Sequence, residues 1–270
     1  PLDRETLRAC PDLRLVCVAA TGTNNIDVAA ARELGIAVAN VRRYATPSVV
    51  QHVFALILAL TTRLNEYREA VLRGDWQRAP AFCLLDFPIR ELAGRTLGIL
   101  GFGELGRSVA EVARAFGMRV VVGQRPGGPA QPDRLPLEDL LRRSDVLSLH
   151  VPLAPDTRGL IGARELALMK VDALLINTAR GGILDEQALA DALVAGRLGG
   201  AGIDVLAEEP PIHGSPLLDN NIPNLIVTPH TAWASRESRQ RCIDGIADNI
   251  SAFGRGAYLN RVDLELADNP

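Results

Sequence analysis

From Arg95 onward, short aliphatic runs alternate with amphipathic stretches along the chain. The aliphatic runs, which are typical of strands buried on both faces, lie at residues 97–100, 119–122, 146–149, 173–176, 202–205 and 225–227. The amphipathic stretches between them, each long enough for a crossover helix, include residues 107–116, 137–143, 164–170 and 186–195. This alternation predicts an α/β fold built on a doubly wound parallel sheet.

Two longer helical patterns, residues 48–72 and 235–253, lie before and after this block and are candidates for hinge helices between domains. In front of them, residues 13–19 and 36–38 have the pattern of strands, and residues 25–34 have the pattern of a helix. A βαβ unit of this size is too small to bury a core alone. We therefore expect a discontinuous second domain formed by residues 1–47 and 236–270, in addition to a main domain at residues 48–235.

The composition narrows the expected partner to a small molecule. The net charge is −3 and the basic residues form no cluster, so neither nucleic acid nor a membrane surface is expected. The longest apolar run, residues 53–60, is far shorter than the roughly 20 residues of a membrane-spanning helix, and no signal-peptide pattern is present. We expect a soluble, cytoplasmic protein.

The cysteines and histidines indicate neither a disulfide framework nor a metal site. Cys10, Cys17, Cys83 and Cys242 lie far apart in the sequence, without a Cys-x-x-Cys pair. The histidines form no cluster with glutamate or cysteine of the kind that binds zinc. We expect reduced structural thiols and no catalytic metal.

A glycine-rich motif lies directly after the first aliphatic run of this block and opens the helix that follows. Its residues are Gly101, Phe102, Gly103, Glu104, Leu105 and Gly106. Between a strand and a helix, the first glycine permits a tight turn, the second lets a pyrophosphate approach bare backbone, and the third lets helix and strand pack closely. The N–H groups at the helix start can bind phosphate. An ordinary glycine turn is the alternative, but this setting predicts a dinucleotide-binding, Rossmann-type domain at residues 48–235.

The choice of cofactor depends on the residues after the second strand of this domain. NAD-specific sites place an acidic residue there, on the ribose 2′-hydroxyl. This chain has Gln124 and Arg125 instead. Without a carboxylate to repel a 2′-phosphate, and with an arginine able to pair with it, NADP(H) is favoured over NAD(H). If Arg125 points to solvent, the choice between the two cofactors stays open.

Three polar segments follow the last three predicted strands, at residues 177–182, 204–210 and 228–231. Ligands of open α/β sheets collect at the carboxyl ends of strands, and these segments supply Arg180, Glu209 and His230. Arginine can bind a carboxylate and a keto oxygen, histidine can protonate that oxygen as hydride arrives, and glutamate can keep the imidazole protonated. The trio suits reduction of a 2-keto acid, although each residue alone could be a surface ion pair, a helix cap or a loop residue.

The chain resembles the D-isomer-specific 2-hydroxyacid dehydrogenases over nearly its whole length. The resemblance is carried by residues 19–27, the glycine motif, residues 149–153 with Thr157, residues 177–182 with Asp185 and Glu186, and the pairs Glu209-Pro210 and Pro229-His230. Within the family, residues 82–86 and 231–235 are most similar to the glycerate dehydrogenase and hydroxypyruvate reductase group.

The resemblance implies roles for the matching residues. Arg180 would bind the substrate, Glu209 would be the acid partner, and His230 would be the general acid in reduction and the base in oxidation. Backbone N–H groups of Thr21 and Gly22 would hold the substrate carboxylate. Together with the glycine motif, the expected cofactor-binding residues are Gly101, Gly103, Glu104, Leu105, Gly106, Gln124, Arg125, His150, Val151, Pro152, Thr157, Thr178, Ala179, Arg180, Asp204, His230 and Ala232.

The same resemblance bears on architecture and partners. It implies a flavodoxin-like α/β substrate domain, which in the family begins with a strand and a helix ahead of the position of Pro1, so we expect this domain to be incomplete at its N-terminus. The helix at residues 48–72 matches the family's interdomain helix, which contributes to a dimer interface, and we expect a homodimer. Asp204 would bind the nicotinamide carboxamide.

Two aromatic-ring residues outside the motifs have more than one interpretation. His52, in the first long helical pattern, is expected to be a structural residue that faces an interface or the cleft, not a second catalyst. Trp76 is expected to pack under the end of that helix, or to close the substrate pocket of a neighbouring subunit.

The leading hypothesis is an NAD(P)-dependent oxidoreductase that transfers hydride between the nicotinamide and C2 of a small D-2-hydroxy acid or 2-keto acid. Hydroxypyruvate/D-glycerate or glyoxylate are the first substrate candidates. A dinucleotide-sensing, corepressor-like binding protein on the same scaffold stays open, since such a protein can keep Arg180, Glu209 and His230. An inactive fragment is the third possibility. The segments around Cys83 and Trp233 favour the enzyme.

Overall fold

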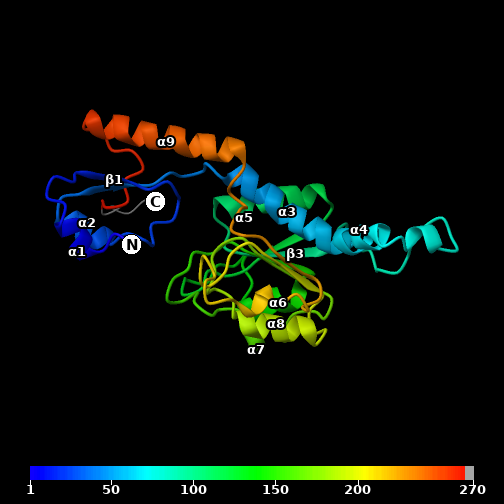
Figure 1. Cartoon of the computed structure of the whole chain (residues 1–270). Coiled ribbons are helices and arrows are strands. Elements are labelled where there is room, and N and C mark those ends of the chain that lie inside the picture. Colours follow the sequence, from blue (N-terminus) through cyan, green and yellow to red (C-terminus); the bar gives the residue numbers. More distant parts are fainter. Residues whose placement is uncertain (265–270) are drawn as a thin grey trace. The chain divides into compact units, whose positions relative to one another are not determined.

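The computed structural model of the chain describes residues 1–264 and divides into two compact units (Figure 1). The larger unit comprises Val49–Ala232. The smaller unit comprises Pro1–Ser48 and the chain from Trp233 onward, so it is assembled from both ends of the sequence.

The larger unit is built on a six-stranded parallel sheet in the order β4-β3-β5-β6-β7-β8. The strands are β3 (Thr96–Leu100), β4 (Arg119–Val122), β5 (Val146–Leu149), β6 (Leu174–Asn177), β7 (Gly200–Ile203) and β8 (Leu225–Val227). The chain leaves β3 for β4 on one side and then returns to place β5 on the other side of β3. This reversal is the topological switch point at which doubly wound sheets bind nucleotides. The sequence prediction of a Rossmann-type sheet is confirmed.

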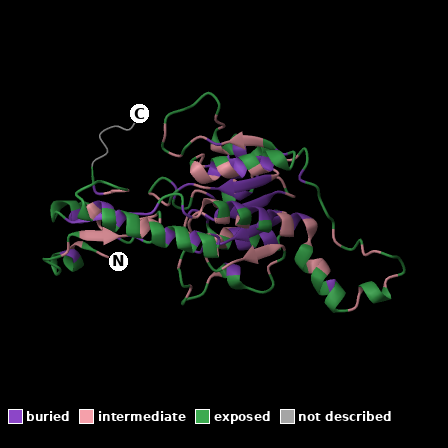
Figure 2. Ribbon diagram, turned by 90° about the horizontal axis from the view of Figure 1, so that it is seen from above, coloured by how far each residue is buried: buried purple, intermediate pink, exposed green. Residues whose placement is uncertain are grey.

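Helices cover both faces of this sheet (Figure 1). They are α3 (Thr46–Thr62), α5 (Glu104–Ala115), α6 (Leu137–Arg143), α7 (Ala163–Leu166) and α8 (Glu186–Val194). Helix α4 (Leu64–Leu72) and a 3₁₀ turn at Trp76–Arg78 extend away from the sheet (Figure 1), and a second 3₁₀ turn lies at Pro216–Leu218. The leucines of α6, α7 and α8 pack with β5 and β6 in one buried cluster on one face, while α3 and α5 lie on the other. The central strands β3, β5, β6 and β7 are almost fully buried, whereas the edge strands β4 and β8 are only partly buried (Figure 2). Burial on both faces explains why their sequences are continuous aliphatic runs.

The smaller unit contains a two-stranded parallel sheet, β1 (Leu15–Cys17) beside β2 (Ala37–Ala39), in which Leu15 pairs with Ala37. Its helices are α1 (Arg4–Arg8), α2 (Val28–Glu33) and α9 (Arg236–Gly254). Buried Asp263 accepts a hydrogen bond from Val38 N at 2.8 Å, which ties the end of the described chain to β2.

The structure differs from the sequence prediction at the first long helix. The pattern at residues 48–72 predicted one helix, but Arg63 adopts a left-handed backbone conformation (φ 55°), and α3 and α4 meet there at a 59° bend. Just before the break, the hydroxyls of Thr61 and Thr62 donate to the carbonyls of Ile57 and Leu58, a local bond that competes with helix geometry. Among residues 1–264 no single helix is long and apolar enough to cross a membrane, although the bent α3–α4 pair passes on length and composition.

Other boundaries also differ from the prediction, at β7 and α7 among them. Strand β7 covers Gly200–Ile203, two residues earlier than predicted. Its glycines leave room for α3, since a Cβ on Gly202 would lie 2.9 Å from the Cβ of Leu56. Helix α7 ends at Leu166 instead of reaching Lys170, whose ammonium group binds Asp145 at 2.8 Å.

Candidate active site

The glycine motif forms a loop between β3 and α5 that only glycine can complete. Gly101 has φ +94°, and a Cβ there would lie 2.6 Å from the backbone of His150. A Cβ on Gly106 would lie 2.2 Å from the carbonyl oxygen of Gly101, so the helix packs directly on the turn. Gly103, by contrast, faces open space and leaves its backbone bare. Two glycines therefore permit close packing and the third leaves room for a phosphate.

At the end of β4, the two residues expected to select the cofactor differ in exposure. The Gln124 side chain donates from Nε2 to Gln131 O and accepts from Gln131 N at Oε1, each at 3.1 Å. These two bonds hold together the ends of the loop between residues 124 and 131. Arg125 is exposed and forms no ion pair within residues 1–264. No carboxylate follows β4 directly, as the sequence already indicated.

Directly after β5, His150 has a partly buried side chain whose Nε2 lies 2.8 Å from Ser148 Oγ. Burial lowers the pKa of His150 to about 4, so the ring is neutral near pH 7. Its Nδ1 is buried without a hydrogen-bond partner. The hydroxyl of Thr157 closes the following turn: it donates to Pro152 O at 2.6 Å and accepts from Ala154 N at 2.8 Å.

After β6, a buried asparagine shapes the loop that carries Arg180. The Asn177 side chain accepts from Ala179 N at 3.0 Å and donates to Arg180 O at 2.9 Å. Arg180 is half-buried, and its Nη1 donates to Ala179 O at 2.7 Å. The hydroxyl of Thr178 is buried without a partner. This loop therefore holds one arginine in place and keeps one buried polar atom for a ligand.

After β7, Asp204 is 1% exposed and organises the loop that follows β8. Its Oδ1 accepts from Thr228 Oγ1 at 2.5 Å and from Thr231 N at 2.9 Å, and its Oδ2 accepts from Ala232 N at 2.9 Å. A carboxylate has about four lone-pair positions. One position on Oδ2 is therefore left for a donor from a ligand.

His52 of α3 joins this network. Its Nε2 lies 2.9 Å from Thr228 Oγ1 and 3.5 Å from Asp204 Oδ1. Because the hydroxyl of Thr228 gives its one hydrogen to Asp204, it must accept from His52, so Nε2 carries the hydrogen. The sequence suggested a structural histidine that faces an interface or the cleft. Nothing in the local pattern linked it to Asp204, which lies far along the chain.

Glu209 and His230 form a directed pair. Glu209 Oε2 lies 2.7 Å from His230 Nδ1, and Glu209 Oε1 accepts from Leu206 N at 2.9 Å, so both carboxylate oxygens are fixed. His230 has a left-handed backbone (φ 53°) and donates its N–H to Asp204 O at 2.8 Å. With Nδ1 bound to the carboxylate, Nε2 is the ring atom left for a substrate. Such a histidine can donate or accept one proton.

Backbone contacts join the three segments. A Cβ on Gly181 would lie 1.8 Å from the Leu206 carbonyl oxygen, so the loop after β6 packs directly against the loop after β7. Leu206 binds Glu209, Glu209 binds His230, and His230 binds Asp204. The expected substrate residues Thr21 and Gly22 belong to the smaller unit. There Thr21 Oγ1 donates to Val41 O at 3.0 Å, and Thr21 O accepts from Asn40 Nδ2 at 2.7 Å.

The carboxyl edge of the sheet fits a dinucleotide. It offers a bare backbone at Gly103, orphaned buried atoms at His150 Nδ1 and Thr178 Oγ1, and a spare acceptor on Asp204. Within residues 1–264, no group of three or more His, Cys, Asp or Glu side chains is arranged to hold a metal ion.

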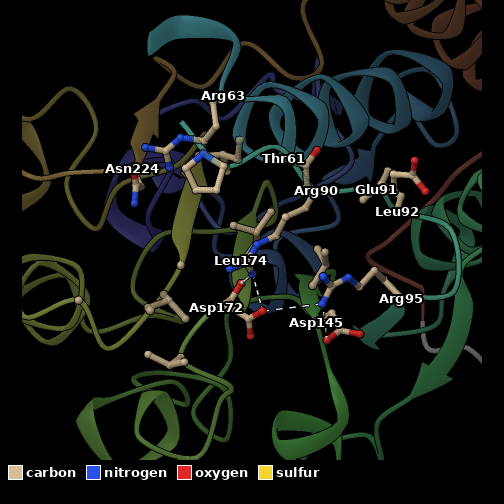
Figure 3. Close-up of a pocket in the computed structure, with 17 residues that line it drawn as sticks. Thr61, Arg63, Arg90, Glu91, Leu92, Arg95, Asp145, Asp172, Leu174 and Asn224 are labelled. Carbon is tan, nitrogen blue, oxygen red and sulfur yellow. Dashed lines mark hydrogen bonds and ion pairs between the residues drawn. The ribbon is translucent and has the colours of Figure 1, made fainter. Parts of the chain in front are cut away.

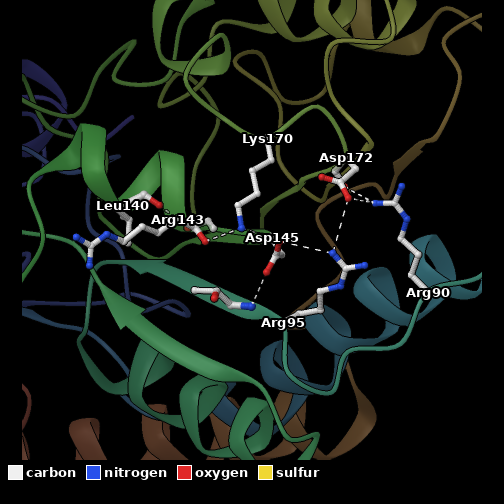
Figure 4. A network of polar contacts seen from close by, with 9 residues as sticks. Arg90, Arg95, Leu140, Arg143, Asp145, Lys170 and Asp172 are labelled. Atoms are coloured by element: carbon white, nitrogen blue, oxygen red, sulfur yellow. Dashed lines mark hydrogen bonds and ion pairs between the residues drawn. The ribbon is translucent and has the colours of Figure 1, made fainter.

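A cavity of about 330 Å³ lies at the opposite, amino edge of the same sheet (Figure 3). Its labelled lining residues include Arg63, Arg90, Arg95, Asp145 and Asp172. Most of these charges are already paired: Asp145 binds Lys170 and Arg95, and Asp172 binds Arg90 and Arg95 (Figure 4). The cavity therefore lies away from the chemistry, and its polar groups are bound to one another.

Residues 54–232 match the family of the D-isomer-specific 2-hydroxyacid dehydrogenases, in its NAD-binding domain. The chain is 49% identical over 263 residues to a glycerate dehydrogenase of Methylorubrum extorquens, covering 97% of this chain and 83% of that protein. It is 39% identical to a hydroxypyruvate reductase of Blautia hydrogenotrophica, covering 97% of this chain and 82% of the relative.

Among solved structures, the TT0316 protein of Thermus thermophilus is similar with a TM-score of 0.87 and 37% sequence identity. The match covers 97% of this chain and 82% of that chain. Similarity at this level extends over both units of the present structure.

Proposed function

Because the chain belongs to the D-isomer-specific 2-hydroxyacid dehydrogenases, we propose that it interconverts a small D-2-hydroxy acid and its 2-keto acid with a nicotinamide cofactor. Hydroxypyruvate/D-glycerate is the first substrate pair, followed by glyoxylate. The observation that carries this proposal is the Glu209–His230 pair, fixed at both carboxylate oxygens and placed at the same sheet edge as the glycine loop.

His230 handles the proton in this mechanism. In reduction, Nε2 donates a proton to the keto oxygen, which becomes the hydroxyl group of the product; in oxidation, the same nitrogen takes that proton back. The Oε2 of Glu209, at 2.7 Å from Nδ1, orients the ring so that Nε2 is the nitrogen left for the substrate. When bound, the nicotinamide supplies the hydride to C2 or accepts it from C2.

Arg180 binds the substrate. Its half-buried guanidinium is anchored through Nη1, which leaves further N–H groups for the carboxylate and the keto oxygen of a 2-keto acid. The backbone N–H groups of Thr21 and Gly22, in the smaller unit, hold the substrate carboxylate. That unit is thus the substrate domain, and the larger unit is the dinucleotide domain.

The carboxyl edge of the sheet would hold the cofactor. The loop from Gly101 to Gly106 would bind its pyrophosphate, and the spare acceptor position of Asp204 would bind its carboxamide. His150, Val151 and Pro152 line the adenosine side. NADP(H) is favoured over NAD(H), because the residues directly after β4, Gly123 to Arg125, include no carboxylate to oppose a 2′-phosphate.

The working form is a homodimer. Large apolar side chains are exposed on the segment after α4, at 53% for Trp76, 90% for Phe82, 83% for Leu85 and 58% for Ile89. Apolar and aromatic side chains gathered on one exposed segment are typical of a protein interface.

The test follows the loss of NADPH and NADH absorbance with hydroxypyruvate, glyoxylate and pyruvate. We expect turnover with hydroxypyruvate or glyoxylate that falls about 1000-fold in His230→Ala, since general acid catalysis contributes roughly 10²–10⁴. His213→Ala, which removes a 79% exposed side chain, is the matched control and keeps the activity. Tight cofactor binding without turnover would contradict the enzyme and support a dinucleotide sensor.

A further inference from the structure

Arg134 lies beside the glycine loop, although the sequence gives it no place in any motif. The following residue, Leu135, forms a parallel bridge with Gly123. Two backbone hydrogen bonds fix this pairing: Leu135 N donates to Val122 O at 2.9 Å, and Gln124 N donates to Leu135 O at 2.8 Å. Arg134 is therefore held at the carboxyl end of β4, where doubly wound sheets meet the adenosine ribose.

The Arg134 guanidinium lies over the ring of Phe102, 4.7 Å from its centroid. Phe102 stands between Gly101 and Gly103, in the loop whose bare backbone faces the expected pyrophosphate. A cation held on an aromatic face keeps its charge while losing conformational freedom before any ligand arrives. The position of the arginine is thus set by the glycine loop itself.

The charge of Arg134 is poorly neutralised within the described chain. Its side chain is only 19% exposed, and its Nε is buried without a hydrogen-bond partner. Its ion-pair partner is the neighbouring Asp133, whose Oδ2 lies 3.7 Å from Nε and whose side chain is 79% exposed. A buried donor of this kind costs free energy unless a ligand satisfies it.

We propose that Arg134 is the residue that binds the 2′-phosphate of NADP(H) and so decides between the two cofactors. This inference rests on the proposed function only in taking the glycine loop as the dinucleotide site. A guanidinium can donate two parallel hydrogen bonds to a phosphate, whereas the 2′-hydroxyl of NAD(H) offers no charge to bind. Arg125, which the sequence pointed to, is exposed and contacts no ring or carboxylate in the described chain.

The test measures dissociation constants for NADPH and NADH by nucleotide fluorescence in the whole protein. We expect Arg134→Met to weaken NADPH binding about 10- to 100-fold, as for a lost hydrogen bond between charged groups, while NADH binding changes less than about 3-fold. Arg119→Met, at the exposed amino end of β4, is the matched control and leaves the ratio of the two constants unchanged. Equal weakening of both cofactors by Arg134→Met would overturn the inference, and so would a loss of preference in Arg125→Met instead.

Two further measurements separate this inference from the proposed function. Phe102→Leu removes the aromatic face but keeps the loop, and should weaken NADPH binding about 3-fold with little effect on NADH. The dissociation constants of adenosine 2′,5′-bisphosphate and 5′-AMP can also be compared. Their difference measures the contribution of the 2′-phosphate to binding, without any turnover. If Arg134→Met weakens the binding of the bisphosphate but not of 5′-AMP, the role of Arg134 is confirmed even in a protein that reduces no keto acid. If NADH-dependent turnover is high but the two nucleotides bind alike in the unaltered protein, only the Arg134 inference fails.

Discussion

The two ends of strand β5 carry ionisable residues in opposite circumstances. Asp145, just before the strand, accepts hydrogen bonds from Thr96 N at 2.7 Å and from Lys170 Nζ at 2.8 Å. His150, just after it, is partly buried; one ring nitrogen is bonded to Ser148, and the other is buried without a partner. The ionisable group at the amino end of β5 therefore has hydrogen-bond partners, whereas the one at the carboxyl end has a buried ring nitrogen without a partner.

The pKa directions reflect this difference. Burial alone would raise the pKa of Asp145, but the hydrogen bonds from Lys170 and Thr96 and the charges of Lys170 and Arg95 outweigh it and lower that pKa. Burial is the cause that lowers the pKa of His150, and no charged partner offsets it. The amino edge therefore binds its charges internally, whereas the carboxyl edge keeps polar groups for a ligand.

The largest expected difference between the two edges comes from exchanging one arginine on each edge for methionine. Arg180→Met should lower kcat/KM for the keto acid about 300-fold, because a substrate carboxylate would lose its charged partner. Arg90→Met, at the amino edge, removes a 40% exposed partner of Asp172 and should leave kcat/KM within about 2-fold, at a stability cost below about 1 kcal/mol. Steady-state kinetics measures kcat/KM, and urea unfolding measures the stability of both variants. A large loss of kcat/KM in Arg90→Met would contradict the proposal that only the carboxyl edge serves the reaction.

The next effect is on stability. Asp145→Ala leaves the Thr96 N–H without its acceptor and the Lys170 ammonium without its carboxylate partner, and should lower the free energy of unfolding by about 2–3 kcal/mol. Asp172→Ala is the matched control, with a 33% exposed carboxylate and an expected loss of about 1 kcal/mol or less. Urea titrations measure both. The turnover of the folded fraction should stay unchanged in each variant, and a lowered kcat would mean that the amino edge serves the reaction.

The smallest effect appears on acidification. The folded pKa of His150, about 4, lies below the unfolded value of about 6.5, so between these values the unfolded chain binds the extra proton. His150 thus makes stability fall as the pH drops, by about 2 kcal/mol between pH 7 and pH 5.

The variant His150→Gln should not show this loss of stability between pH 7 and pH 5, so its stability should depend less steeply on pH. Glutamine does not titrate, and it can still form a hydrogen bond with Ser148. His213→Gln, at an exposed position, should leave the slope as it is. Urea unfolding of the cofactor-free protein at each pH measures the difference. An unchanged slope in His150→Gln would show that the buried ring is not the group that responds.

Much of the fold could be predicted because its signals are local. Helix α6 has the predicted bounds, and the glycine motif begins directly after β3. Glu209 and His230, 21 residues apart in sequence, are joined at 2.7 Å. The break at Arg63 could not be predicted, since the apolar pattern continues across it and only its left-handed backbone ends α3.

By itself, the sequence determined the aliphatic runs, the glycine loop and the set of reactive side chains, because hydrophobic periodicity and turn chemistry act between near neighbours. Only the tertiary structure decided which of these groups meet. It placed His52 on the network of Asp204, and it held Arg134, not Arg125, over the glycine loop. The physical reason is that strand order and the parallel bridge at Leu135 are non-local pairings, which no short stretch of sequence records.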